Sequence, residues 1–333
     1  MNPAFSVIFL TTLIGAAQGL LAVLVVAEWT GMAGHGFLAS SGAVAVLLAA
    51  AGLLASFFHL GHPERAWRAA AMWRTSWLSR EVIVLPAFMG ATALWVLGHA
   101  VDLPVLRAAT PLLAAAALAM AVLLFVCTAM IYASLRFLQE WASAYTLVNY
   151  TLLGLASGAT LALALAALAQ GLPAAELTAS PALLAVDERL PRAVALWALL
   201  STLAGGVSRA LSLRRNARIK PKSTLQTAIG LRHPRIRQTT QGFMGGSFNT
   251  REFFHGKGLP LLRQVKWVFL LLAFVLPVLV LAALLMGDGV APGSGGGLWL
   301  ALFLVQYLGL LAERWFFFAQ ARHPQNLYYQ AVA

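Results

Sequence analysis

The chain has 333 residues, of which 60% are apolar and only 10% are charged, and its formal net charge is +12. Soluble domains are about a quarter charged, so this composition excludes a soluble globular protein and indicates an integral membrane protein. The excess of basic residues does not favour nucleic-acid binding, because these residues lie between apolar stretches rather than on a soluble domain.

Eight stretches are long and apolar enough to cross a bilayer as helices, which takes roughly 20 residues each. They are 5–29, 35–58, 81–100, 109–135, 146–170, 191–212, 265–286 and 297–319. The first is too long for the apolar part of a signal peptide and no basic residue precedes it, so it is predicted to be a membrane span. Pro277 is expected to kink the seventh span. The sequence therefore predicts an all-α integral membrane protein, an eight-helix bundle that forms one polytopic domain over 1–333.

Lys and Arg residues are unevenly distributed over the connections between these spans. One side of the membrane would hold the N-terminus, 59–80, 136–144, 213–264 and 320–333. With their flanks, these segments contain 20 of the 23 Lys and Arg residues, and the other side holds only Arg107, Arg189 and Arg192. Basic residues collect in cytoplasmic connections, so both termini and these segments are predicted to be cytoplasmic.

The chain offers few ligands for a redox centre of its own. Cys127 is the only cysteine, so this chain alone cannot build a thiolate-held cluster. The seven histidines lie at span edges or in connections, away from the mid-membrane positions that a bis-histidine haem requires; Met120 and Met130 remain unusual alternatives. Few ionisable groups lie inside the spans, which disfavours a transporter, although a hydrophobic substrate needs no such groups.

One polar stretch, HLGHPERAWRAAAMWRTSWLSRE, joins the second and third spans and ends at Glu81. His59 ends the second span and Glu81 begins the third, so both side chains are expected at one membrane surface. A quinone site needs hydrogen-bond donors, a proton-exchanging carboxylate or histidine, and apolar walls. His59, Glu81, Arg80 and Trp77 supply these types, and Arg80 is expected to hold Glu81 ionised or to donate to a quinone carbonyl.

A purely structural interpretation of the same stretch stays open. Ser79, also a candidate for the quinone site, would cap the third helix, and Glu81 would complement its N-terminal dipole. The arginines would meet lipid phosphates and the tryptophans would anchor the interface.

A second polar site is predicted at Glu313 and Arg314, near the end of the eighth span. Adjacent helical residues point about 100° apart, so each is expected to find its partner on another span rather than to pair with the other. A structural ion pair and a redox role are both compatible with this pattern.

The long loop 213–264 begins with the polybasic run RRNARIKPK, which is typical of segments that bind lipid headgroups. Its second part mixes phenylalanines with glycines and amides. It is too apolar for a solvated tail and too short for a domain, so it is expected to dock on a soluble partner subunit.

HLGHPERAWRA followed by SWLSRE, together with the ending ERWFFFAQARHPQNLYYQ on eight spans, resembles the membrane anchor subunit family of dimethyl sulfoxide reductase. The resemblance covers essentially the whole chain. It implies a haem-free, multi-pass anchor in the bacterial plasma membrane, without substrate activity of its own. Such anchors hold an iron–sulfur subunit and a molybdopterin catalytic subunit and exchange electrons with ubiquinone or menaquinone. By motif position, the quinol-binding histidine and carboxylate of the family correspond to His59 and Glu81.

The family includes reductases that oxidise menaquinol and sulfite-oxidising complexes that reduce quinone. The cytoplasmic placement of the motif-bearing face, the loop STLQTAIGLRHPRIRQTTQGFMGGSFNTREFFHG and the ending RHPQNLYYQ favour the sulfite dehydrogenase branch, with partner subunits on the cytoplasmic face. The alternatives are an anchor of a menaquinol-oxidising complex and, in a different class, a transporter or a structural scaffold.

Overall fold

The computed structural model describes residues 1–171, 186–220, 222–237, 258–287 and 295–327, and the structural statements below concern these residues. Within them, eight helical spans are long and apolar enough to cross a membrane, and no β-strand is formed. The spans are α1 (Phe5–Trp29), α2 (His35–Phe57), α3 (Trp77–Ala100), α4 (Pro104–Ala133), α5 (Ala144–Gly171), α6 (Leu190–Asn216), a composite seventh span (Leu259–Met286) and α11 (Gly296–Ala319). The prediction of eight spans is therefore confirmed.

Three spans extend by four or more residues beyond their predicted ends on one side of the bundle. Helix α3 begins at Trp77, four residues before Glu81, while α6 continues to Asn216 and α9 (Leu259–Leu270) opens the seventh span. The sequence limits were set by hydropathy, which falls where a helix leaves the hydrocarbon region, whereas backbone hydrogen bonding continues past that point. Glu81 is therefore one turn inside its helix rather than at its first residue.

The seventh span is interrupted at the predicted position. A π-helical turn, η3 (Leu271–Val275), separates α9 from α10 (Leu276–Met286), and Pro277 lies in the first turn of α10. Proline has no N–H and its ring crowds the carbonyl four residues earlier, which here belongs to Ala273. That carbonyl accepts a hydrogen bond from Gln306 Nε2 of α11 at 3.4 Å, so it remains satisfied in the membrane interior.

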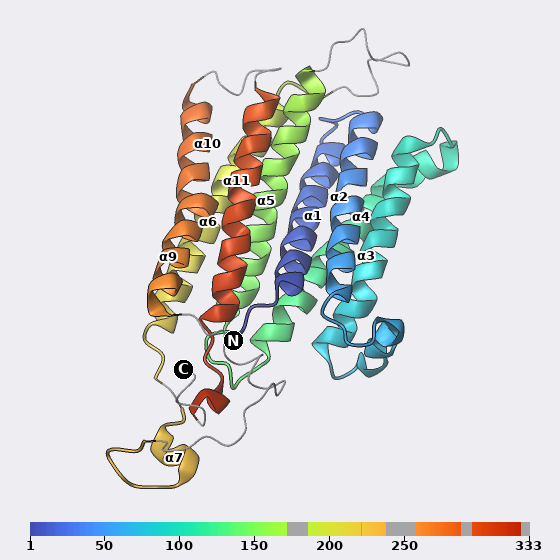
Figure 1. Cartoon of the computed structure of the whole chain (residues 1–333). Coiled ribbons are helices and arrows are strands. Elements are labelled where there is room, and N and C mark those ends of the chain that lie inside the picture. The colour runs from blue at the N-terminus through green and yellow to red at the C-terminus, as the bar shows by residue number, and fades with distance from the viewer. Residues whose placement is uncertain (172–185, 221, 238–257, 288–294, 328–333) are drawn as a thin grey trace.

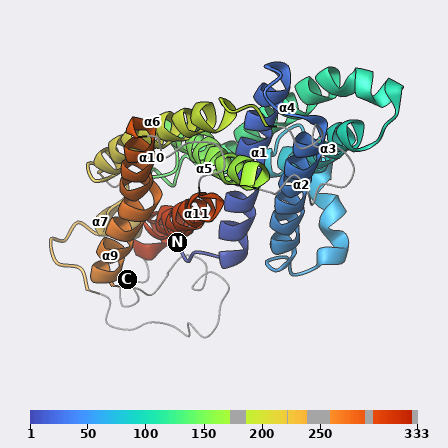
Figure 2. The same cartoon turned by 90° about the horizontal axis from the view of Figure 1, so that it is seen from above.

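The spans form two groups that meet at α1 and α5, as the view along the bundle shows (Figure 2). Helices α1 to α4 make up the first group; α5, α6, the composite span and α11 make up the second. Gly19 of α1 and Gly158 of α5 bring the two central backbones together, since a Cβ added at Gly158 would overlap the backbone of Gly19. Small residues permit this close helix approach where no hydrophobic effect drives association.

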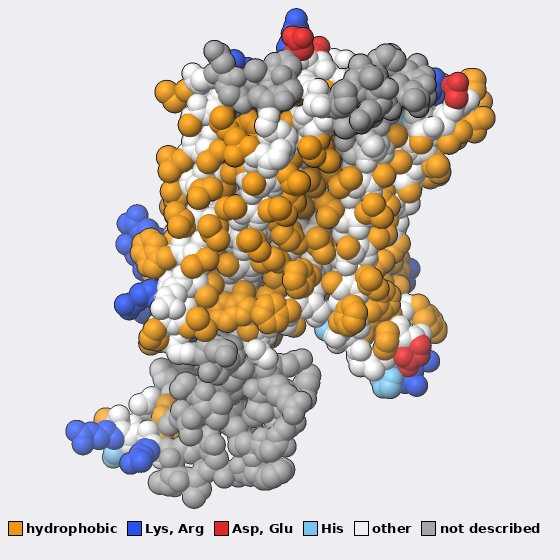
Figure 3. Space-filling model, turned by 45° about the horizontal axis from the view of Figure 1, so that its top comes forward, with side chains coloured by type: hydrophobic (Ala, Val, Ile, Leu, Met, Phe, Trp, Pro, Cys, Tyr) orange, Lys and Arg blue, Asp and Glu red, His pale blue; other side chains and the backbone are white. Residues whose placement is uncertain are grey.

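The N-terminus and the C-terminal end of α11 lie at the same end of the bundle, here called the N/C end (Figure 1), where the amino group of Met1 donates to the carbonyl of Ala321 at 2.8 Å. The 3₁₀ helix η1 (Pro63–Met72) and the short α7 (Leu225–Ile229) lie at this end too. Between the two ends, the surface over the helices is mainly hydrophobic (Figure 3), as a bilayer requires. The assignment of the N/C end to the cytoplasm stays a prediction.

The long connection is shorter than predicted, because α6 ends at Asn216 and α9 begins at Leu259. Arg215, within the polybasic run, donates to the carbonyl of Gln139 at 2.9 Å and so ties α6 to the connection between α4 and α5. That arginine therefore has a structural partner within the chain. The aromatic part of the loop over 238–257 and the end of the tail over 328–333 lie outside the described residues, and the partner docking predicted there stays a prediction.

Candidate functional site

Glu81 is buried in the bundle near the N/C end, with 7% of its surface exposed. Its Oε1 accepts a hydrogen bond of 2.5 Å from the hydroxyl of Thr128 on the neighbouring α4. Among the ion pairs of the described residues, none includes Glu81. A carboxyl group at membrane depth with one neutral hydrogen-bond partner destabilises the folded protein. Such residues are rare in membrane spans and typically mark a functional site.

The start of α3 is fixed by Ser76 rather than by Ser79. Ser76 is the N-cap, and its Oγ accepts from the backbone N–H of Ser79 at 3.3 Å. Ser79 is itself buried, as Glu81 is. The predicted capping role of Ser79 is therefore wrong, and its hydroxyl stays a candidate donor at this end of the bundle.

Arg80 points away from Glu81. Its Nε donates to the carbonyl of Trp73 at 2.9 Å and its Nη2 to the carbonyl of Arg74 at 2.8 Å. The guanidinium also lies 4.2 Å from the ring centroid of Trp77, a cation–π contact. Arg80 thus fastens the turn between η1 and α3, and the expected ion pair with Glu81 is not formed.

His59 follows the end of α2 and is exposed at the N/C end. Neighbouring groups partly desolvate its imidazole and lower the pKa below the usual value, which favours the neutral ring at pH 7. A neutral imidazole offers one donor and one acceptor nitrogen, which suits a hydrogen bond to a quinone carbonyl or proton transfer. The described hydrogen bonds do not join His59 to Glu81, so the structure places them at one end of the bundle without direct contact.

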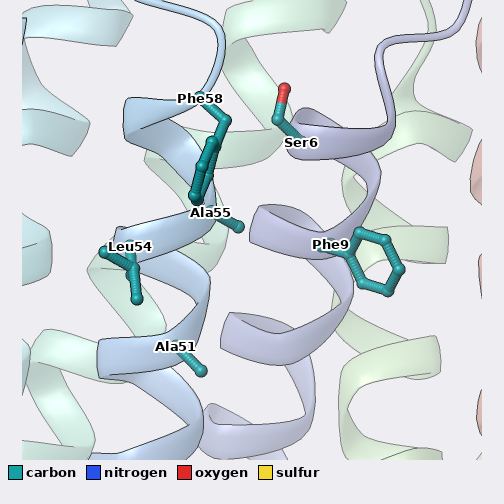
Figure 4. Close-up of a pocket in the computed structure, with 6 residues that line it drawn as sticks. All are labelled: Ser6, Phe9, Ala51, Leu54, Ala55 and Phe58. Atoms are coloured by element: carbon teal, nitrogen blue, oxygen red, sulfur yellow. The ribbon is translucent and has the colours of Figure 1, made fainter.

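An open apolar groove of about 340 Å³ runs between α1 and α2 at the same end of the bundle (Figure 4). It is lined by Ser6, Phe9, Ala51, Leu54, Ala55 and Phe58. Phe58 directly precedes His59, so the groove leads from the apolar surface toward the stretch that carries the candidate polar groups. Its size and apolar lining fit part of an isoprenoid tail.

The second predicted polar site is a fully buried three-residue ion cluster. Glu313 Oε1 lies 2.7 Å from Arg209 Nε on α6, and Glu313 Oε2 lies 2.9 Å from Arg314 Nε. The expected partner on another span is therefore confirmed for Glu313. The expectation that Glu313 and Arg314 would not pair with each other is wrong, because the long Arg314 side chain brings its Nε within reach of Glu313 Oε2. Arg209, an ionisable residue at membrane depth in the sixth span, was not part of the site predicted from the sequence.

A third polar group, centred on Glu28, lies at the opposite end of the bundle. His35 and His99 are joined by a 2.7 Å contact between their Nδ1 atoms, and His99 Nε2 lies 3.2 Å from Glu28 Oε1. Trp95 donates to Glu28 Oε2 at 2.8 Å. Sequence reasoning missed this group, although the sequence contains one signal for it, since Trp95 and His99 are four residues apart and share one face of α3.

The described residues contain no group of three or more His, Cys, Asp or Glu side chains arranged to hold a metal ion. The candidate site is instead a buried carboxyl with a hydroxyl donor, a neutral histidine and an apolar groove, all at one end of the bundle. This set can exchange protons with an apolar molecule that enters from the bilayer.

Two comparisons bear on this arrangement. A family described as "DMSO reductase anchor subunit (DmsC)" matches residues 1–225, which include His59 and Glu81 but not the Arg209 partners on α11. The chain is also 49% identical, over an alignment of 349 positions that covers all of both proteins, to a sulfite dehydrogenase subunit of Allochromatium vinosum.

Proposed function

The chain belongs to the DMSO reductase anchor subunit family, and from this premise we propose that it exchanges electrons between an iron–sulfur partner subunit and membrane quinone. As a family member it is a multi-pass membrane anchor of a molybdopterin oxidoreductase. The observation that carries the proposal is Glu81, a carboxyl buried at membrane depth without an ion-pair partner among the described residues. Quinone chemistry takes up or releases protons, and a buried carboxyl near the membrane surface can transfer them.

Each residue of the site has a proposed role. Glu81 exchanges protons with the quinone headgroup, Thr128 orients its carboxyl, and His59 donates to a carbonyl or relays the proton toward water. The isoprenoid tail occupies the groove between α1 and α2. Arg80 and Trp77 hold the η1–α3 turn that closes the site. The partner subunits supply the iron–sulfur clusters and the molybdopterin, and this chain binds quinone, the exchangeable substrate, without haem.

The electron donor that we propose is sulfite, oxidised by the catalytic subunit on the cytoplasmic face. The 49% identity to a sulfite dehydrogenase subunit over the full length of both proteins supports this choice. The 20 to 3 distribution of basic residues supports the cytoplasmic placement of the N/C end in a bacterial plasma membrane. In this direction quinone is reduced, and Glu81 acts as proton donor.

The Glu81→Gln variant of the assembled complex tests the proposal. We expect the rate of sulfite-dependent quinone reduction to fall at least about tenfold, because a general acid or base typically contributes a factor of about 10²–10⁴ to the rate. Reduction of an artificial dye, which takes electrons directly from the partner subunits, should be unchanged. Glu64→Gln, at an exposed glutamate of η1, is the matched control and should behave as the parent.

Wild-type quinone turnover in Glu81→Gln would contradict the proposed function. Loss of the partner subunits from this variant would assign Glu81 a structural role instead. Recovery of the chain alone, without a molybdenum or an iron–sulfur subunit, would favour a transporter or scaffold.

A further inference from the structure

Two aromatic residues lie between the candidate quinone site and the buried ion cluster. Tyr132 follows Thr128 by one helical turn on α4 and lies within electrostatic range of both Glu81 and Arg314. Its ring stacks with that of Tyr150 on α5 at a centroid distance of 6.0 Å and an interplanar angle of 19°. The guanidinium carbon of Arg314 lies 3.9 Å from the Tyr150 centroid. The two polar sites are therefore joined across four helices.

The ion cluster has an excess of positive charge. It contains two guanidinium groups and one carboxylate, and the three side chains are 1–5% exposed. Nη2 of Arg209 and Nη1 of Arg314 are buried and have no hydrogen-bond partner among the described residues. An uncompensated charge in a low-dielectric interior is expensive, so a negative group elsewhere in the bundle is expected to balance it.

Glu81, in contrast, is a carboxyl group without an ion-pair partner among the described residues. It is buried at the same end of the bundle, its contact is the Thr128 hydroxyl, and its neighbour Arg80 is bound to backbone carbonyls. When Glu81 is ionised, its charge and the net charge of the cluster sum to zero. The cavity next to Tyr150 and Arg314 is only about 20 Å³, room for one water molecule. Tyr150 itself is 6% exposed, so the side of the cluster that faces Glu81 is packed with protein, where charges interact more strongly than in water.

We propose that the Arg209–Glu313–Arg314 cluster is the electrostatic partner of Glu81 and sets the pH range over which the quinone site exchanges protons. The inference rests on the proposed function of Glu81. Arg209, Glu313 and Arg314 are positioning residues in it, because they act on Glu81 through space and do not touch the quinone. The cluster stabilises the ionised form of Glu81, and the polarisable rings of Tyr132 and Tyr150 occupy the intervening space.

The other charged or titratable groups around Glu81 are neutral or lie where solvent screens them. Arg80 is the adjacent cation, but its guanidinium is bound to the carbonyls of Trp73 and Arg74 by hydrogen bonds that are exposed to solvent. On α4 and α5 the titratable groups in its range are Cys127, Tyr132 and Tyr150, all neutral near pH 7 in their ordinary form. Helices α2 and η1 also pack on α3. The charged or titratable groups that they bring to this end of the bundle are exposed to solvent: His59, Glu64, Arg65 and Arg68. Solvent screens charges at those positions strongly.

Two substitutions in the cluster change its charge in opposite directions. Arg314→Gln leaves the pair of Arg209 and Glu313 with no net charge, so the ionised form of Glu81 loses support. Glu313→Gln leaves two guanidinium groups, so that form gains support. Quinone turnover is measured as a function of pH. The part of this pH profile that depends on Glu81 is the part that the Glu81→Gln variant lacks, and its midpoint is the quantity to compare.

We expect this midpoint to move to higher pH in Arg314→Gln and to lower pH in Glu313→Gln. Each shift should be roughly one pH unit. This is the effect on a carboxyl group of changing one unit charge at a distance on the order of 10 Å, with an effective dielectric constant of about 20. Arg314→Lys keeps the charge and should restore the parental midpoint. Arg322→Gln removes a charge from an exposed position at the same end and should leave the midpoint unchanged.

Midpoints that stay in place, or that move in the same direction in both variants, would overturn the inference while leaving the role of Glu81 intact. If Glu81→Gln itself leaves quinone turnover unchanged, the proposed function fails first. If Arg314→Gln does not assemble, Arg209→Gln makes the same change in charge and keeps the pair of Glu313 and Arg314. Failure of all the cluster variants to assemble would assign the cluster a purely structural role and would also overturn the inference.

Discussion

At the scale of single residues, the candidate site depends on one hydrogen bond between two helices. Thr128 donates to Glu81 across the α3–α4 contact, and both side chains are buried. Sequence reasoning identified Glu81 because a carboxylate beside an apolar span is conspicuous. It could not identify Thr128, since threonine is common in membrane helices and only the packing of α4 on α3 turns its hydroxyl toward the carboxyl group.

Thr128→Val removes this hydroxyl and nearly preserves the side-chain volume. A hydrogen bond to an ionisable group contributes about 1.5–3 kcal/mol, so we expect quinone turnover to fall roughly 10- to 100-fold with dye reduction unchanged. Thr128→Ser retains the donor and should retain most of the activity. Equal turnover in the valine and serine variants, measured on complexes that hold all their subunits in the parental ratio, would show that the hydroxyl does not orient Glu81.

Arginine contacts show the limit of sequence reasoning at this scale. Arg80 was expected beside Glu81 because the two are adjacent in sequence, but consecutive residues of a helix point in different directions. Arg80 binds backbone carbonyls of the preceding turn, whereas Arg314, over 200 positions away, shares the neighbourhood of Tyr132 with Glu81. The distance between two residues along the sequence therefore did not predict which arginine lies near Glu81.

At the scale of elements, the two helix groups are held together by the contact of α1 with α5. Glycines four residues apart occur on both helices, at Gly15 and Gly19 and at Gly154 and Gly158, and the four positions meet at the interface. The spacing is visible in the sequence and is typical of close helix packing in membranes. The span positions could be predicted from hydropathy, but which two spans pair through their glycines required the structure.

Gly158→Ala should push these two helices apart. A Cβ at this position overlaps the backbone of Gly19, which cannot move as a flexible side chain can. We expect a loss of stability of about 1–3 kcal/mol, seen as a lower midpoint temperature of detergent-solubilised complex. Gly90→Ala on α3 is the control, because nothing lies within 4 Å of the added Cβ. A midpoint in Gly158→Ala equal to that of the control would exclude a tight α1–α5 contact.

At the scale of the whole molecule, polar chemistry is divided between the two ends of an apolar bundle. The N/C end carries Glu81, the Arg209–Glu313–Arg314 cluster and the Arg- and Trp-rich connection 59–80, while the opposite end carries the Glu28–His99–His35 group. Eight spans and a surface apolar between the ends follow from the hydropathy pattern along the sequence. The joining of two separately predicted polar sites through Tyr132 and Tyr150 does not, because it depends on how α4, α5 and α11 converge.

Photolabelling with a quinone that carries an azido group on its ring tests the central claim most directly. We predict that the label in the assembled complex attaches to the peptides spanning the end of α2, the η1 connection and the first turns of α3, where His59 and Glu81 lie. Excess unlabelled quinone should prevent the labelling. Label confined to peptides of other spans, or undiminished by competing quinone, would contradict a quinone site at Glu81.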